Sequence, residues 1–135
     1  GGGCLLTDQS FSEKLRDFVK YDTFTTKDIP VIKFGRHFRL PDGAKLVIGR
    51  SQEDNGHLEI IENENFYHIK TEVIPGPHSL LSRSASKEDT ILATKMIITY
   101  AKTILEQKYT INIDGILHSN TPLESKKEAQ KYSIH

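Results

Sequence analysis

The chain has 135 residues, of which 36% are hydrophobic and 27% are charged, and its mean hydropathy is −0.45. This length suits one compact domain and is too short for two domains with separate cores. No apolar run approaches the roughly 20 residues that a membrane span needs, so we expect no membrane partner. Because 18 basic residues balance 18 acidic ones, net charge offers no argument for a nucleic-acid partner.

The cysteine content and the first residues bear on cellular location. The single cysteine, Cys4, excludes an intramolecular disulfide framework and a zinc site built from several cysteines. It suits a reducing compartment, so we expect a cytoplasmic protein. The chain opens on Gly1-Gly2-Gly3 without a methionine or a secretory signal, and we interpret it as part of a longer protein that begins in a linker. Six histidines are dispersed without paired spacing, which predicts no metal site.

The first half of the chain predicts a helix and a hairpin. A capping-box spacing begins at Ser10 and predicts an amphipathic helix with Val19 on its apolar face. Apolar and polar residues alternate over 32–40, the period of a half-buried strand. Pro41-Asp42-Gly43 then predicts a turn into a return strand over 44–48.

The second half is divided by capping residues and by a proline-glycine break. In chain order we expect a short helix from Ser51 to about Ile61, a strand over 66–74, a break at Pro75-Gly76-Pro77, a continuation at 79–81, the main helix from Ser86 to about Gln107, and a last strand over 109–113. From Ser119 the chain is polar, and its final dozen or so residues are predicted to be loose or weakly helical.

This order of elements predicts the fold class. It indicates a single α+β domain in which helices pack on one face of a mainly antiparallel sheet. We expect residues 1–24 to form a linker and N-terminal helix, residues 25–118 the core, and residues 119–135 a polar tail.

Basic residues concentrate on the predicted hairpin. Arg36, Arg39, Lys45 and Arg50 lie on or beside its strands, whereas residues 52–64 contain five carboxylates and no lysine or arginine. Such segregation can give one face a positive potential in a neutral protein. Ordinary protein surfaces also alternate in charge, so both interpretations stay open.

Arg50 is the strongest candidate for anion binding. It follows an apolar strand and precedes the helix cap Ser51, which places a guanidinium beside the N–H groups of a helix N-terminus. Alternatively, Arg50 pairs with Glu53 or Asp54 and only holds the turn. Pro75-Gly76-Pro77 is likewise either a stiff loop for a ligand backbone or a bulge that interrupts a strand.

Two motifs carry a resemblance to a known family. Gly49-Arg50-Ser51 with Asn55, followed by Pro75-Gly76-Pro77-His78, resembles the RNA-binding domain of the NFACT proteins of ribosome-associated quality control. The family pattern there is an apolar strand, Gly-Arg-Asn, Gln-Asn and later Pro-Gly-Ser-His. The run Gly-Arg-His-Phe-Arg-Leu at 35–40 is similar to the variant of that domain found at the C-terminus of PP-loop tRNA-thiolating proteins. The resemblance covers about residues 1–115.

The resemblance implies an RNA-binding module with no cofactor of its own. Its partners would be tRNA, or ribosome-related RNA, and an N-terminal PP-loop domain of the same protein that uses ATP to thiolate a tRNA base. Together with the charge pattern, it implies RNA contacts by Arg36, Arg39, Lys45, Arg50, Ser51, Asn55, Gly76 and His78. We expect Arg50→Ala to weaken tRNA binding more than a double change of Lys126 and Lys127 in the tail.

Other functions remain open at this point. The sequence shows no phosphate loop, metal constellation or catalytic triad, so we expect the isolated chain to be catalytically silent. Cys4 is either a sulfur carrier in the parent protein or an ordinary linker cysteine. The alternatives are a small nucleotide-processing enzyme that uses His37 or His78 as a base, and a protein-interaction module that binds through the hairpin edge.

Overall fold

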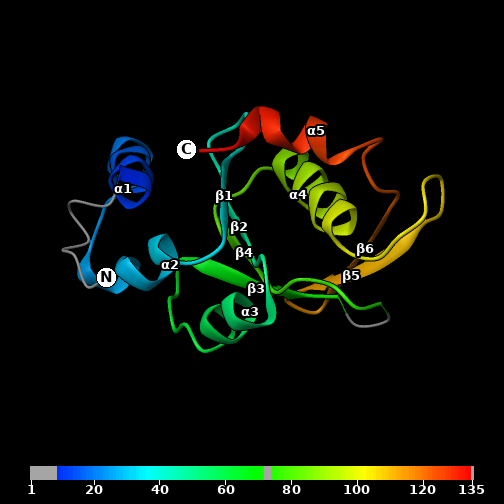
Figure 1. The fold of residues 1–135 in the computed structure, drawn as a ribbon, viewed down its shortest axis with the longest axis horizontal. Coiled ribbons are helices and arrows are strands. Elements are labelled where there is room, and N and C mark those ends of the chain that lie inside the picture. Colours follow the sequence, from blue (N-terminus) through cyan, green and yellow to red (C-terminus); the bar gives the residue numbers. More distant parts are fainter. Residues whose placement is uncertain (1–8, 72–73, 135) are drawn as a thin grey trace.

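A six-stranded sheet with the order β1-β2-β4-β3-β5-β6 runs through the computed structural model, which describes residues 9–71 and 74–134 (Figure 1). Every pair of neighbouring strands is antiparallel. The strands are β1 (Arg36–Arg39), β2 (Lys45–Ile48), β3 (Phe66–Lys70), β4 (Ser79–Ser82), β5 (Tyr109–Ile113) and β6 (Ile116–Asn120).

Helices precede, interrupt and follow these strands. Within the described residues they are α1 (Gln9–Tyr21), the 3-10 helix η2 (Thr26–Asp28), α2 (Ile29–Lys33), α3 (Gln52–Glu59), α4 (Lys87–Tyr100), α5 (Lys126–Ala129) and the 3-10 helix η3 (Gln130–Tyr132). The predicted class, a single α+β domain with an antiparallel sheet, is confirmed.

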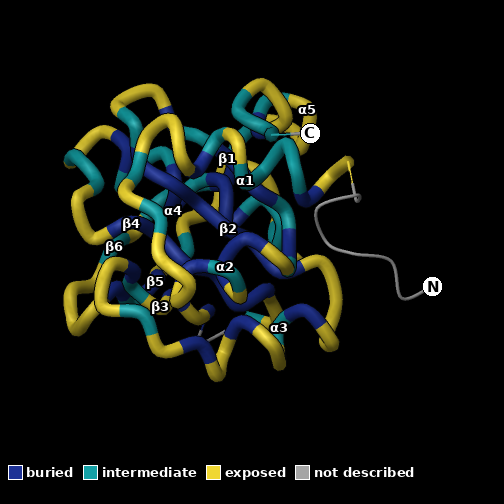
Figure 2. The backbone as a smooth tube through the Cα atoms, turned by 90° about the vertical axis from the view of Figure 1, so that its left-hand side faces the viewer, coloured by how far each residue is buried: buried dark blue, intermediate teal, exposed yellow. Residues whose placement is uncertain are grey.

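The helices cover both faces of the sheet rather than the one face expected. All four residues of β2 are buried, and neighbouring residues of a strand point to opposite faces. Leu46 and Ile48 join a core cluster that includes Met96 of α4, whereas Val47 joins a second cluster that includes Phe18 of α1. Figure 2 shows β2 as a buried strand in the middle of the molecule. The sheet therefore separates two cores, one under α4 and one under α1 to α3.

The turn between β1 and β2 is held by the start of α4. Gly43 has a φ of 100°, which a side chain would disfavour, and its N–H donates to Leu40 O at 2.9 Å. The Asp89 carboxylate accepts from the backbone N–H groups of Asp42 and Ala44, each at 3.1 Å. Ser86 caps α4 by accepting from the Asp89 N–H, as its spacing predicts. The hairpin and the main helix are thus one connected unit.

The N-terminal half differs from the prediction at two places. The strand expected from residue 32 is wrong there, because Ile32 lies in α2 and β1 begins at Arg36. Pro30 occupies the first turn of α2, where proline is well tolerated, and Gly35 with a φ of 86° separates that helix from the strand. The helix predicted from Ser10 is present as α1, but Val19 is 55% exposed and takes no part in its buried face.

The C-terminal half differs at the end of the main helix. α4 stops at Tyr100, not near Gln107, because the backbone at Ala101 is extended. Ile98 O accepts there from the Ala101 N–H at 3.1 Å and from Thr103 Oγ1 at 2.9 Å, so this carbonyl at the helix end has two donors. The strand predicted over 66–74 is shorter, since β3 ends at Lys70. β5 occupies the predicted range 109–113.

The segment after β5 holds an unpredicted strand and a packed C-terminus. β6 pairs with β5 across the turn at Asp114-Gly115, whereas the sequence predicts the strand over 109–113 as the last one. Further on, Ala129 of α5 is fully buried, and the Ile134 N–H donates to His37 O at 2.9 Å. The weakly helical alternative for the tail is therefore confirmed and the loose one is wrong.

Candidate nucleic-acid interface

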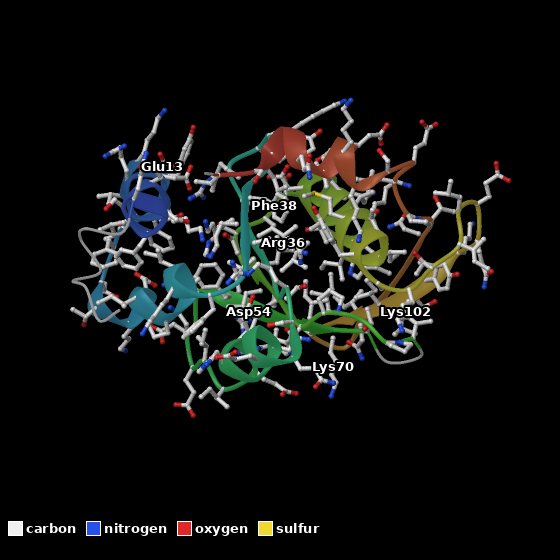
Figure 3. All side chains as sticks on the ribbon, viewed as in Figure 1. Glu13, Arg36, Phe38, Asp54, Lys70 and Lys102 are labelled. Atoms are coloured by element: carbon white, nitrogen blue, oxygen red, sulfur yellow. The ribbon has the colours of Figure 1, made fainter. Side chains whose placement is uncertain are left out.

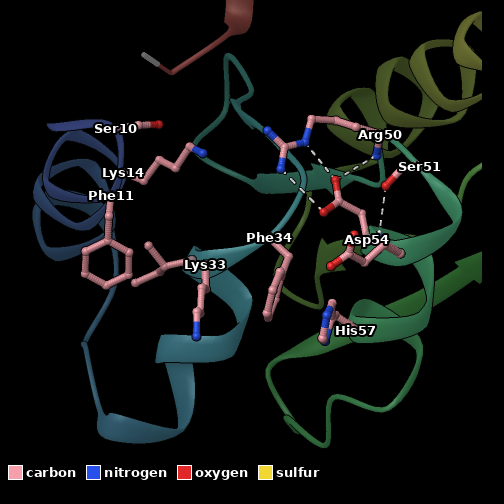
Figure 4. A pocket seen from close by; sticks show the side chains of 11 residues that line it. Ser10, Phe11, Lys14, Lys33, Phe34, Arg50, Ser51, Asp54 and His57 are labelled. Atoms are coloured by element: carbon pink, nitrogen blue, oxygen red, sulfur yellow. Dashed lines mark hydrogen bonds and ion pairs between the residues drawn. The ribbon is translucent and has the colours of Figure 1, made fainter. Parts of the chain in front are cut away.

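The loop from β2 to α3 is built around Arg50 and Asp54. The Asp54 carboxylate accepts from the Arg50 N–H at 3.0 Å, from Nε at 2.7 Å and from Nη2 at 3.4 Å (Figure 4). Ser51 caps α3 by accepting from the Asp54 N–H at 3.2 Å, as predicted. The hydrogen bonds from Arg50 hold the pKa of the Asp54 carboxyl below its usual value. Arg50 thus does hold the turn, which was one of the two alternatives.

Holding the turn leaves much of Arg50 accessible. Its side chain is 53% exposed, against 8% for Asp54. A guanidinium has five N–H donors, and only two of them point at Asp54. Three donors remain for an incoming anion, so structural pairing and phosphate binding are compatible at this residue.

Asn55 joins this loop to the loop before β4. Its Oδ1 accepts from the His78 N–H at 3.1 Å, while the Gly49 N–H donates to His78 O at 3.0 Å. A Cβ added at Gly49 would collide with Asn55 Oδ1. The spacing of Gly49, Asn55 and His78 therefore has a structural cause: the glycine makes room for the amide that fastens the second loop.

The Pro75-Gly76-Pro77 loop is fastened on its other side to the end of α4. Pro75 O accepts from the Lys102 N–H at 3.3 Å. A Cβ at Gly76 would lie 2.5 Å from Thr71 Oγ1 and 3.0 Å from Ala101 Cβ, so only glycine fits there without a shift. This tether brings the residues that follow α4 beside those that follow β2, although about fifty residues separate them in sequence.

A cavity of about 460 Å³ lies where these loops meet. We call it the basic cavity; it is lined by Arg36, Gly49, Arg50, Ser51, Gln52, Asn55, Pro75, Gly76, Pro77, Tyr100, Lys102 and Lys126. Four of these described residues are cationic and none is a carboxylate. Figure 3 shows Arg36 in the middle of the molecule and Lys102 at the end of α4.

Tyr100 forms the aromatic part of this cavity. Arg36 Cζ lies 4.7 Å and Lys126 Nζ 5.6 Å from the centre of its ring, distances at which a cation is attracted to an aromatic face. Arg36 Nη1 also donates to Gly49 O at 3.2 Å. Burial raises the pKa of the Tyr100 hydroxyl, which therefore stays protonated and can donate a hydrogen bond.

The structure brings five of the predicted site residues together and adds three. Arg36, Arg50, Ser51, Asn55 and Gly76 all line the basic cavity. Sequence analysis missed Tyr100, Lys102 and Lys126. The expectation that Lys126 lies in a tail away from this site is wrong. No local sequence signal marks these three, since contacts between segments distant in sequence place them beside Arg50: the Pro75 loop is bonded to Lys102, and α5 with Lys126 packs against α4.

Arg39 and Lys45 lie on the opposite face of the sheet. Arg39 is three residues from Arg36, so its side chain leaves the other face of β1. There its guanidinium binds Asp17 at 2.7 Å and Asp22 at 3.0 Å. Lys45, its partner across the hairpin, is fully buried, and burial lowers the pKa of its ammonium to about 7. Neither residue belongs to an exposed basic surface, so the expected surface of all four basic residues is not formed.

The His78 ring also points away from the basic cavity. It is 8% exposed, and its Nε2 lies 2.7 Å from His68 Nδ1. Because His68 Nε2 must donate to the carbonyl of Ile61 at 2.7 Å, neutral His68 accepts from His78 at Nδ1. Burial is the main cause that lowers the pKa of His78 to about 4. His78 reaches the cavity region only through its backbone.

His37, the other candidate base, is engaged in the fold. The ring is 2% exposed, and its Nε2 donates to Phe34 O at 2.7 Å. Burial lowers the pKa of His37 well below its ordinary value. Cys4, the candidate sulfur carrier, lies outside the described residues.

Residues 9–71 and 74–134 contain neither a cluster of metal ligands nor a membrane-spanning helix. No three histidine, cysteine, aspartate or glutamate residues there come together as metal ligands. No helix there has the length and apolar character needed to cross a membrane.

Comparison with known proteins identifies the family. Residues 35–133 match the family model described as NFACT protein RNA binding domain, which is most of the chain. The chain belongs to this family. The expectation of an NFACT-type RNA-binding domain is thereby confirmed, whereas the match does not extend to a PP-loop thiouridylase parent.

A solved structure supports the fold. The C-terminal part of the fibronectin/fibrinogen-binding protein from Streptococcus suis superposes with a TM-score of 0.62 at 12% identity, covering 93% of this chain and 68% of that one. At such low identity the similarity concerns the fold alone. No curated protein matches the sequence.

Proposed function

We propose that the basic cavity is the site at which this NFACT-type domain holds the phosphate backbone of RNA. The observation that carries the proposal is its composition: four cationic side chains, a tyrosine and no carboxylate among the described lining residues. Lysine and arginine supply most protein contacts to nucleic-acid phosphates. The net charge of zero is no obstacle, because four cationic side chains meet at this one place without a carboxylate among the described lining residues.

The cationic residues of the basic cavity contribute to phosphate binding in different ways. Arg50 offers the three guanidinium donors that Asp54 leaves open. Arg36 is held in place by Tyr100 and Gly49 O, which reduces the conformational entropy lost on binding. Lys102 and Lys126 reach the cavity from segments far apart in sequence, so folding itself assembles the site.

The test compares two lysines from the two ends of α4. Lys102→Ala removes a cation from the basic cavity, whereas Lys87→Ala removes an exposed one at the helix start. We expect the first change to weaken binding of bulk tRNA by about tenfold or more, since a hydrogen bond to a charged group contributes about 1.5–3 kcal/mol. The second should leave affinity unchanged. If both variants and the unsubstituted chain bound tRNA with equal affinity, the RNA would have to bind elsewhere.

We further propose tRNA as the RNA and a PP-loop base-thiolating enzyme as the remainder of the parent protein. The support is the resemblance of residues 35–40 to the domain variant appended to such enzymes. ATP would then bind the enzyme domain and not this one. In the full-length parent, Arg36→Ala combined with Lys102→Ala should lower tRNA thiouridine content, with Lys87→Ala as the control. Normal thiouridine in cells lacking the parent would exclude this assignment and leave ribosome-related RNA as the alternative partner.

A further inference from the structure

A second cavity adjoins the basic cavity at Arg50. It has a volume of about 680 Å³ and lies between α1, α2 and α3. Its described lining includes Arg50 and Ser51, which it shares with the basic cavity, together with Lys14, Lys33, Phe34 and His57. We call it the aromatic cavity. Its volume falls within the range of about 300–1,000 Å³ that is typical of small-ligand pockets.

Two stacked rings form one wall of the aromatic cavity. The Phe34 and His57 rings lie 4.1 Å apart with only 4° between their planes. Figure 4 shows them side by side, with Lys33 beyond Phe34. Lys33 Nζ lies 5.5 Å from the centre of the Phe34 ring and adds a cation to the same wall. The wall is therefore aromatic and positively charged, and because the two rings cover each other's inner faces, a further ring can stack only on an outer face of the pair.

Packing of the fold explains Phe34 but not His57. Phe34 is half buried and packs against the core cluster under α1 to α3. His57 is exposed and belongs to neither core cluster, and its ring makes no hydrogen bond with any described residue. Its stacking on Phe34 holds an aromatic ring at the surface in a fixed orientation. Bases of single-stranded RNA stack on such rings, with little dependence on sequence.

The charges around the aromatic cavity are compatible with a nucleotide. Lys14, Lys33 and Arg50 are the cations of the described lining, and Asp54 is already paired with Arg50. Glu53 is the other carboxylate of the lining, and it lies in the first turn of α3. A phosphate bound by Arg50 would stand between the two cavities. The base attached to it could then reach the aromatic wall.

We propose that the aromatic cavity binds an unpaired base of the RNA, stacked on the pair formed by Phe34 and His57, while the adjoining phosphates occupy the basic cavity. This inference rests on the proposed function, because it places the phosphate at Arg50. It goes beyond that function by making the domain selective for RNA with an unpaired or extruded nucleotide. A continuous duplex keeps its bases stacked inside and cannot supply one.

The test uses His57, which can be changed without opening the core. The probes are a short single-stranded oligoribonucleotide, with 2-aminopurine in place of one base, and a blunt duplex in which the same strand is paired with its complement over its whole length. His57→Ala should weaken binding of the single strand about tenfold, because stacking of one base contributes about 1–3 kcal/mol, and should reduce the quenching of 2-aminopurine. His57→Phe should restore both. Binding of the blunt duplex should not change.

The matched control is His118→Ala, which removes a histidine from β6 at the far edge of the sheet and should change nothing. Unchanged single-strand affinity in His57→Ala would overturn the inference. Equal losses on the single strand and the blunt duplex would do so as well, since they would indicate a phosphate contact. If the unsubstituted chain bound neither probe, the proposed function itself would be wrong. That outcome differs from failure of the stacking site, in which RNA still binds but His57→Ala has no effect.

Discussion

Gly49→Ala tests why a glycine precedes Arg50. Gly49 does not have a positive φ, so alanine causes no backbone strain and its cost is steric alone. The new Cβ would collide with Asn55 Oδ1 and lie 3.3 Å from His78 O. The Asn55 amide has to move, and its 3.1 Å hydrogen bond from the His78 N–H is lost. His78 is 8% exposed, so water does not readily replace the acceptor.

The magnitude follows from the donor that loses its partner. A buried donor left unsatisfied costs about 1–3 kcal/mol, and we expect the free energy of unfolding to fall by that amount, measured by urea denaturation followed with circular dichroism. Asn55→Ala should cost a similar amount because it removes the same acceptor. In the double variant the collision disappears, so its cost should match that of Asn55→Ala alone.

The control is Gly56→Ala in α3. A Cβ there meets nothing within 4 Å, and alanine should stabilise the helix by up to about 1 kcal/mol. If Gly49→Ala had the same free energy of unfolding as the unsubstituted chain, the proposed tether between the two loops would be refuted. It would also be refuted if the destabilisations of the two single variants added up in the double variant.

Two further predictions concern buried and paired charges. Burial lowers the pKa of Lys45 from 10.5 to about 7. Between these pH values the unfolded chain binds more protons than the folded one, so the free energy of unfolding rises with pH. Lys45→Met should therefore stabilise the protein by on the order of a few kcal/mol near pH 6 and progressively less toward pH 10, as measured by urea denaturation across pH. A gain independent of pH would contradict this reasoning. Arg50→Ala should let the pKa of the Asp54 carboxyl rise toward its usual value and should also weaken tRNA binding; an NMR titration that finds the Asp54 pKa unchanged would show that the ion pair has little influence in solution.

Local signals in the sequence predicted much of the fold. Ser51 and Ser86 cap helices as expected, because the cap hydrogen bond depends only on residues three positions apart. Ile32 was misassigned because Ile32 and Phe34 alternate like strand residues, while the proline that starts α2 precedes them. The end of α4 was placed too late because Ile104 continues the apolar periodicity after the helix has ended, where its side chain is 68% exposed.

Which site residues could be predicted also depends on whether they lie close together in sequence. Arg50, Ser51 and Asn55 were found because one loop and one helix turn carry them. Lys102 and Lys126 depend on contacts between distant segments, above all the hydrogen bond from the Lys102 N–H to Pro75 O, which no local pattern encodes. The charge pattern alone predicts Arg39 and Lys45 as RNA contacts, because a count of charges along a strand does not distinguish its two faces.

The salt dependence of RNA binding tests the central claim most directly. The association constant of the unsubstituted chain for tRNA should fall by about three log units for each log unit of salt concentration. This slope is expected when the four cations of the basic cavity contact phosphates, because each phosphate contact contributes about 0.7–0.9 to it. The double variant Arg36→Ala/Lys102→Ala should lose about half of that slope, and Lys87→Ala none of it. A slope that stays the same in the double variant, with folding intact, would contradict the assignment of the basic cavity as the RNA site.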